Sequence, residues 1–147
     1  MSDPQSDDWG DFGTDSRTGE VHISEGDEQP EPPALRFPTL DRFVLEYLVL
    51  IYRRDTTATN IFWCKEWFKH AEAIARLEGM WRAWEKLRLD PGEGGSNWWL
   101  GHADPHMRVL LSEDGPFKHC RKGGHVEERS TPLPSDTPPA GLFDINA

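Results

Sequence analysis

The chain has 147 residues, of which 26 are acidic and 16 basic, so its formal net charge is −10. The acidity lies at the ends: the first 34 residues contain ten acids and one base, whereas residues 35–127 contain thirteen acids and fourteen bases. This length excludes a large enzyme with its own cofactor domain, because one domain commonly takes ~100–150 residues.

The longest apolar run, residues 43–52, is interrupted by Glu46 and is much shorter than the roughly 20 residues that a membrane span needs. The first residues also lack the basic and apolar regions of a secretory signal. We therefore expect no membrane span, a cytoplasmic location and two reduced cysteines.

The composition predicts three regions. Residues 1–35 form an acidic arm and residues 123–147 a Pro-rich tail, and both are expected to be disordered because they carry too few large apolar groups to offset the entropy of ordering. Residues 36–122, which contain six of the seven tryptophans, form the folded domain. We predict an all-α fold, a small Trp-rich bundle of three to five helices.

The first helix is expected to begin after Thr39, a residue that can cap a helix, with Asp41 in its first turn. Its apolar residues recur at helical spacing up to Ile51, and others fill the opposite side. A helix that is apolar nearly all round is usually the buried centre of its domain. A pair of strands remains the alternative, because short apolar runs are ambiguous.

The clearest element covers about residues 70–89. At ~100° per residue its apolar side chains fall on one broad stripe, which comprises Ala73, Ile74, Leu77, Met80, Trp81, Trp84 and Leu87. The sequence Asp90-Pro91-Gly92 is expected to end this helix. His70, on the same stripe, is read as a core residue, and most glutamates are placed on the solvated face.

Two further short helices are expected. Ser96 can cap the first, which would hold Trp98 and Trp99, and Asp104 can cap the second, with Pro105 at its first position. This interpretation places a break between the two helices just before Pro105.

An ordered series of short motifs runs through the domain. It comprises Phe37-Pro38-Thr39-Leu40, Trp63-Cys64, Glu66-Trp67 with His70, Trp81-Arg82-Ala83-Trp84-Glu85, Trp98-Trp99, His102-Ala103-Asp104-Pro105-His106-Met107, Gly115-Pro116-Phe117 and Cys120. The series resembles an actinobacterial family known only as domain of unknown function 4913, over about residues 36–121. The resemblance implies a setting on plasmids and integrative conjugative elements. It implies no activity and no catalytic residues.

A metal site is one candidate. His102 and His106 are four residues apart, and Cys64 and Cys120 could complete a tetrahedral zinc site, with His70, His119 or His125 as substitutes. Pro105 argues against one unbroken helix carrying both histidines. The alternatives are that the histidines tie a helix junction together, that the cysteines are ordinary buried thiols, and that the protein has no cofactor.

Nucleic-acid binding is a second candidate. Trp63, Trp67, Trp98 and Trp99, with the basic residues Lys118, Arg121 and Lys122, would suit a single strand. The nearly neutral domain and the acidic arm oppose this interpretation, because most nucleic-acid binders are strongly basic.

Protein binding is the leading hypothesis. Trp9 and Phe12 lie among the acids Asp7, Asp8 and Asp11, a pattern typical of peptides that dock into basic, apolar grooves, and Trp98 and Trp99 could face a partner. No catalytic signature is present. We therefore expect a non-enzymatic accessory or adaptor protein, with nucleic-acid binding and a zinc-stabilised domain as alternatives.

Overall fold

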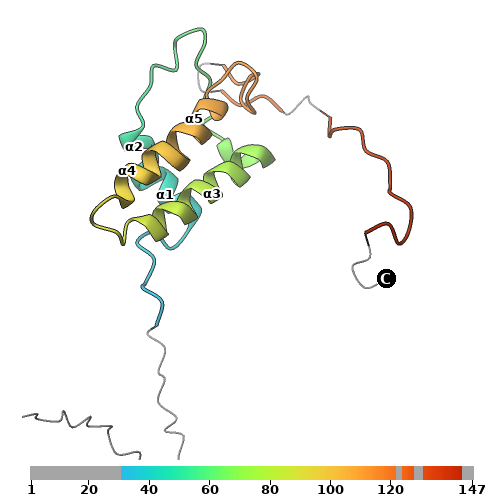
Figure 1. Ribbon diagram of the computed structural model, residues 1–147. Coiled ribbons are helices and arrows are strands. Elements are labelled where there is room, and N and C mark those ends of the chain that lie inside the picture. Colours follow the sequence, from blue (N-terminus) through green and yellow to red (C-terminus); the bar gives the residue numbers. More distant parts are fainter. Residues whose placement is uncertain (1–30, 122–123, 128–130, 144–147) are drawn as a thin grey trace, which may run out of the picture. The chain divides into compact units, whose positions relative to one another are not determined.

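The computed structural model of the chain describes residues 31–121, 124–127 and 131–143. In this part the chain forms three continuous helices, and the only β-type pairing is a single bridge residue at Cys64 (Figure 1). The first helix consists of α1 (Leu40–Phe43), the π-helical turn η1 (Val44–Leu48) and α2 (Val49–Ile51). The second is α3 (Ala71–Leu87), preceded by the 3-10 turn η2 (Trp67–Lys69). The third consists of α4 (Gly94–Trp98), the π-helical turn η3 (Trp99–Ala103) and α5 (Asp104–Leu110). The predicted all-α, Trp-rich fold is confirmed.

The first helix is buried on one side only. Phe43, Val44 and Leu48 are fully buried, whereas Leu45 and Leu50 are more than half exposed. The expectation that this helix is the buried centre of the domain is therefore wrong. Its outer apolar side chains are left without a covering helix in the described part of the chain.

The centre is α3, which packs against α1, η2, α4, η3 and α5. Its buried side chains Ala73, Leu77 and Met80 belong to the predicted stripe, so the period-3.6 pattern located the helix and its inner face. Figure 1 shows α3 and the third helix side by side and antiparallel, joined by a short loop. Glu85 is an exception to the solvated glutamates, because it is only 7% exposed.

The third helix is continuous, and the predicted break before Pro105 is wrong. Proline lacks the N–H that would bond to the fourth preceding carbonyl, and its ring would clash there. The π-helical turn η3 lies just before Pro105 and shifts the hydrogen-bond register, so the chain stays helical. Ser96 therefore lies inside α4, and Asp104 continues the helix without capping it.

A close approach of backbones fixes the start of this helix. A Cβ atom on Gly94 would lie 1.9 Å from the carbonyl oxygen of Leu87 at the end of α3. Only glycine fits at this point, so the turn between α3 and α4 depends on Gly94.

An aromatic cluster fills the space between the helices. Trp98 is 2% exposed, and its indole Nε1 donates a hydrogen bond to the carbonyl oxygen of Met80 at 3.0 Å. Its ring contacts those of Phe43 and Tyr47, and Trp84 packs on the same group. Trp84 and Trp98 thus contribute to the packing of the core.

The described residues after position 130 lie outside the helical bundle. Residues 131–143 are exposed and form no helix, with one turn near Gly141. The predicted acidic arm, including Trp9 and Phe12, lies outside the described residues up to position 30. Among the helices that the structure describes, none has the length and apolar character to cross a membrane.

Candidate metal centre

Two cysteines and two histidines converge beside the start of α3. The sulfur atoms of Cys64 and Cys120 and one ring nitrogen each of His70 and His125 all lie within 4.8 Å of one another. Both cysteines are free and buried, His70 is buried, and the imidazole of His125 is 8% exposed. A buried set of two thiols and two imidazoles is a typical ligand set for zinc.

The site joins two segments that are far apart in the sequence. Cys64 and His70 flank the turn η2, in which Lys69 and His70 donate backbone hydrogen bonds to the carbonyl oxygens of Glu66 and Trp67. This turn places His70 immediately before α3, at the N-cap position. One short, tightly folded segment therefore directs the side chains of both Cys64 and His70 into the cluster.

The second segment follows α5. Phe117 is fully buried and its carbonyl oxygen accepts a hydrogen bond from the backbone N–H of Cys120 at 2.8 Å, so a tight turn holds the cysteine inward. The ring of Phe117 also contacts the ring of His70, with centroids 5.1 Å apart. His125 follows Cys120 by five positions, and the two histidine rings are 5.1 Å apart.

The distances fit a tetrahedral ion. The sulfur of Cys64 lies 3.4 Å from Nδ1 of His125, and the sulfur of Cys120 lies 3.5 Å from Nε2 of His70. With Zn–S bonds of about 2.3 Å and Zn–N bonds of about 2.0–2.1 Å, a tetrahedral centre places S and N about 3.5 Å apart. Two of the S–N separations thus match those of a zinc coordination shell, and all four ligand atoms lie within 4.8 Å of one another.

Neighbouring groups orient the ligand atoms. The backbone N–H of Val126 donates to the sulfur of Cys120 at 3.4 Å, a bond that stabilises a thiolate. Nε2 of His125 faces the carboxylate of Glu127 at 3.5 Å, which leaves Nδ1 directed at Cys64. The Glu127 side chain is 90% exposed and its contact is too long for a hydrogen bond, so Nε2 of His125 is buried without a hydrogen-bond partner among the described residues.

Burial raises the pKa of the Cys64 thiol to about 11, the nearby sulfur of Cys120 adds to this, and a hydrogen bond from the backbone of Glu66 opposes it. A bound divalent cation reverses this preference, since a coordinated thiol is deprotonated. The cluster can therefore hold a metal ion, and four protein ligands would leave no coordination position for a substrate.

The structure places His102 and His106 elsewhere. Both are half-buried on η3 and α5, and Nε2 of His106 lies 3.9 Å from where a Cβ on Gly79 of α3 would be. The pKa of His106 is lowered by burial and by the positive charges of Arg76 and His102. An environment that disfavours one positive charge is a poor one for a cation, and among the described residues this pair gathers no further ligand.

The cluster therefore contains both predicted cysteines, but its histidines are His70 and His125 in place of His102 and His106. The sequence alone offers His70 and His125 only as substitute ligands, and it also places His70 in the core. The signal in the sequence is the repeated pair of a cysteine followed by a histidine, Cys64 with His70 and Cys120 with His125, at separations of six and five positions.

The other predicted site residues are dispersed. Trp98 is in the core, and Trp99 is half-buried, with its ring stacked on that of Tyr52. Lys118 and Arg121 are exposed, and the Arg121 guanidinium lies 4.8 Å from the centre of the Phe62 ring. Lys122 falls outside the described residues.

Comparison with known proteins gives a family but no described relative. No curated protein and no solved structure matches the chain significantly. A family model matches residues 37–139, a stretch that contains all three helices and the four residues of the Cys/His cluster. The chain belongs to the family described as Domain of unknown function (DUF4913).

Proposed function

We propose that the protein is a small, zinc-stabilised, non-enzymatic adaptor that binds a protein partner. The observation that carries this proposal is the buried cluster of Cys64, His70, Cys120 and His125, whose S–N separations of 3.4 and 3.5 Å match a tetrahedral zinc ion. A closed site with four protein ligands favours a structural ion over a catalytic one.

Zinc would contribute directly to folding. The described residues form three helices, and the described parts of the two segments that carry the ligands have no helix apart from the single turn η2. An ion that binds both segments would fix them against the start of α3, and its binding free energy would add to the stability of the fold.

The adaptor role is supported by the outer side of the first helix. Leu45 and Leu50 are 58% and 55% exposed on a helix that otherwise packs into the core. Exposed apolar side chains grouped on one element are a common mark of a protein-binding surface. An actinobacterial mobile-element setting belongs to the same proposal, on the strength of the family resemblance, and so does a cytoplasmic location.

The zinc proposal is tested by metal analysis of matched variants of the full chain, purified without chelator. We expect one zinc per chain in the wild type, and a loss of zinc in Cys64→Ser and His125→Ala. The controls are His102→Ala and His106→Ala, which should keep the metal and which replace the other candidate ligands. Zinc that is absent from the wild type, or lost only from the control variants, contradicts the proposal.

Partner binding is tested by affinity capture with the wild type and with Leu50→Asp as bait, and Leu100→Asp is the matched control at another exposed leucine. A partner captured by the wild type and by Leu100→Asp, but not by Leu50→Asp, supports the adaptor role. Equal capture by all three baits, or no capture, contradicts the use of this surface.

A further inference from the structure

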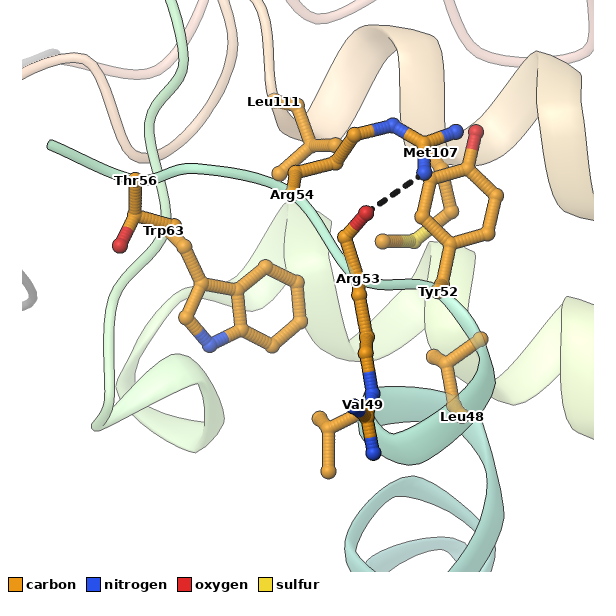
Figure 2. Close-up of a pocket in the computed structure, with 9 residues that line it drawn as sticks. All are labelled: Leu48, Val49, Tyr52, Arg53, Arg54, Thr56, Trp63, Met107 and Leu111. Atoms are coloured by element: carbon orange, nitrogen blue, oxygen red, sulfur yellow. Dashed lines mark hydrogen bonds between the residues drawn. The ribbon is translucent and has the colours of Figure 1, made fainter. Parts of the chain in front are cut away.

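A cavity of about 350 Å³ opens beside the end of the first helix (Figure 2). Figure 2 shows Tyr52 and Trp63 on opposite sides of the cavity, with Arg53 and Arg54 between them. Most of its lining is apolar, and the residues are Leu48, Val49, Tyr52, Arg53, Arg54, Thr56, Trp63, Met107 and Leu111. The cavity lies on the face of the bundle formed by α2, α5 and the loop that follows α2.

The cavity continues into exposed apolar surface. Val49, which lines the cavity, is 37% exposed, and Leu45 precedes it by one helical turn on the same side. A second hollow of about 410 Å³ shares Tyr52, Arg54 and Leu111 with the first. The two hollows and the exposed side chains of Leu45 and Val49 together form one continuous strip, mainly apolar at the first hollow and more polar at the second.

Positive charge surrounds this strip. Arg53 and Arg54 line the first hollow and Arg108 lines the second. None of the three forms an ion pair with a carboxylate of the described residues, in contrast to the arginines of α3. Asp104 also lines the second hollow, where its Oδ1 accepts a hydrogen bond from the Tyr52 hydroxyl at 3.2 Å, so the linings of the two hollows carry three positive charges and one negative charge.

We propose that this strip, the Arg53–Arg54 groove, binds an acidic peptide segment of a partner protein. An aliphatic or aromatic side chain of the peptide enters the 350 Å³ cavity, and flanking carboxylates pair with Arg53, Arg54 and Arg108. The inference rests on the proposed adaptor role and names the chemistry of the partner that this role requires.

A single-stranded nucleic acid fits the groove less well. Base binding needs an open aromatic face, but the guanidinium of Arg54 already lies over the Tyr52 ring, 4.2 Å from its centre. Trp63 also lines the cavity, but its ring packs against that of Phe117, with centroids 5.1 Å apart, and the rest of the wall is largely aliphatic. A wall of this kind accepts a branched or aromatic side chain, and it lacks the row of open rings on which successive bases stack.

The test uses the full chain and a fluorescein-labelled synthetic dodecapeptide with a central Leu-Phe pair flanked by Asp and Glu. Fluorescence anisotropy at low salt should show saturable binding that weakens as salt is added. The double variant Arg53→Gln with Arg54→Gln should weaken binding by about tenfold or more, because it removes two positive charges that would pair with carboxylates of the peptide. Arg82→Gln, at an exposed arginine of α3 outside the groove, is the matched control and should bind as the wild type does.

A second pair of variants tests the apolar part. Val49→Asp places a negative charge in the lining and should abolish binding, whereas Leu100→Asp, outside the groove and 70% exposed, should leave it unchanged. Far-UV circular dichroism and zinc content are recorded for each variant, so loss of fold is distinguished from loss of binding.

The inference is overturned if the peptide does not bind, or if its Asn/Gln counterpart binds equally well. It is also overturned if an oligodeoxythymidylate binds more tightly and displaces the peptide. Failure to bind the peptide by a fully zinc-loaded protein refutes the groove and leaves the zinc proposal intact. Zinc-free protein that still binds the peptide refutes the zinc proposal and leaves the groove intact.

Discussion

Replacement of the buried Glu85 by alanine should destabilise the protein far more than replacement of the exposed Glu78 on the same helix. The Glu85 carboxylate accepts hydrogen bonds from the backbone N–H groups of Phe37 and Arg36, at 2.8 and 3.0 Å, and pairs with Arg88 at 2.7 Å. It therefore holds the chain before α1 against α3. Truncation leaves the buried N–H of Phe37 without its acceptor, at about 1–3 kcal/mol, the partly buried N–H of Arg36 at less, and the loss of the pair with Arg88 adds to this.

We expect Glu85→Ala to lower the free energy of unfolding by about 3–4 kcal/mol, since such losses are not fully additive. That is a large part of the stability of a domain of this size, which is on the order of 4–14 kcal/mol. Glu78→Ala also removes a contact to an arginine, Arg82 at 2.7 Å, but both side chains are exposed. It should cost no more than about 0.5 kcal/mol.

Urea unfolding at pH 7 in zinc-containing buffer, followed by circular dichroism, measures both variants. Both substitutions introduce alanine into α3, so the intrinsic helix propensity changes equally in the two. Free-energy losses that agree within about 0.5 kcal/mol would refute the assignment of Glu85 as the buried tie between the N-terminal segment and α3.

The remaining predictions concern a backbone contact and the effect of acid. Gly94→Ala should destabilise the fold by about 2 kcal/mol or more, because its Cβ would lie 1.9 Å from the carbonyl oxygen of Leu87. Gly95→Ala should instead stabilise α4 by about 0.5–1 kcal/mol, because its Cβ would have no neighbour within 4 Å. Equal melting temperatures of the two variants would contradict this prediction. Burial raises the pKa of Glu85, but hydrogen bonds from Phe37 and Arg36 and the charge of Arg88 outweigh it, so the pKa in the folded protein is lowered. The stabilising effect of this carboxylate is then complete above the unfolded-state pKa of about 4.3 and is lost as the pH falls through the lower folded-state value. The difference in unfolding free energy between the wild type and Glu85→Gln should thus be constant from pH 7 to 5 and shrink below about pH 4, and a difference that grows in acid would contradict the lowered pKa.

The helical class and α3 followed from local sequence information. The apolar stripe containing Leu77 and Met80 has a period that only a helix satisfies, and tertiary contacts agreed with it. The sequence also predicts the first helix, but the expectation that this helix is buried on all sides is wrong. Apolar residues on both sides of a helix look alike in sequence, whether the outer side is covered by another helix or left for a partner.

The third helix shows a different limit of local reasoning. Pro105 after Asp104 is a common start of a helix. No local pattern in the sequence predicts the π-helical turn η3, which lets the helix continue past Pro105. Similarly, Glu85 looked like any glutamate of an amphipathic helix. Its buried position depends on the segment before α1, which is 48 residues away along the chain.

A Cys/His cluster that could hold a metal was expected from the sequence, but with other histidines than those the structure brings together. His102 and His106 are predicted ligands because two histidines four residues apart lie on the same face of a helix. The observed cluster instead depends on two loops, around Cys64 and Cys120, that meet only after the helices have packed. Such a meeting is a property of the tertiary fold, and spacing along the chain does not determine it.

The most direct test of the proposed zinc centre is X-ray absorption at the zinc edge on the full chain purified without chelator. We predict zinc with two sulfur neighbours at about 2.3 Å and two nitrogen neighbours at about 2.0–2.1 Å, with the sulfur signal reduced in Cys120→Ser. A protein that contains no zinc, or a zinc shell of nitrogen and oxygen atoms alone, would contradict it.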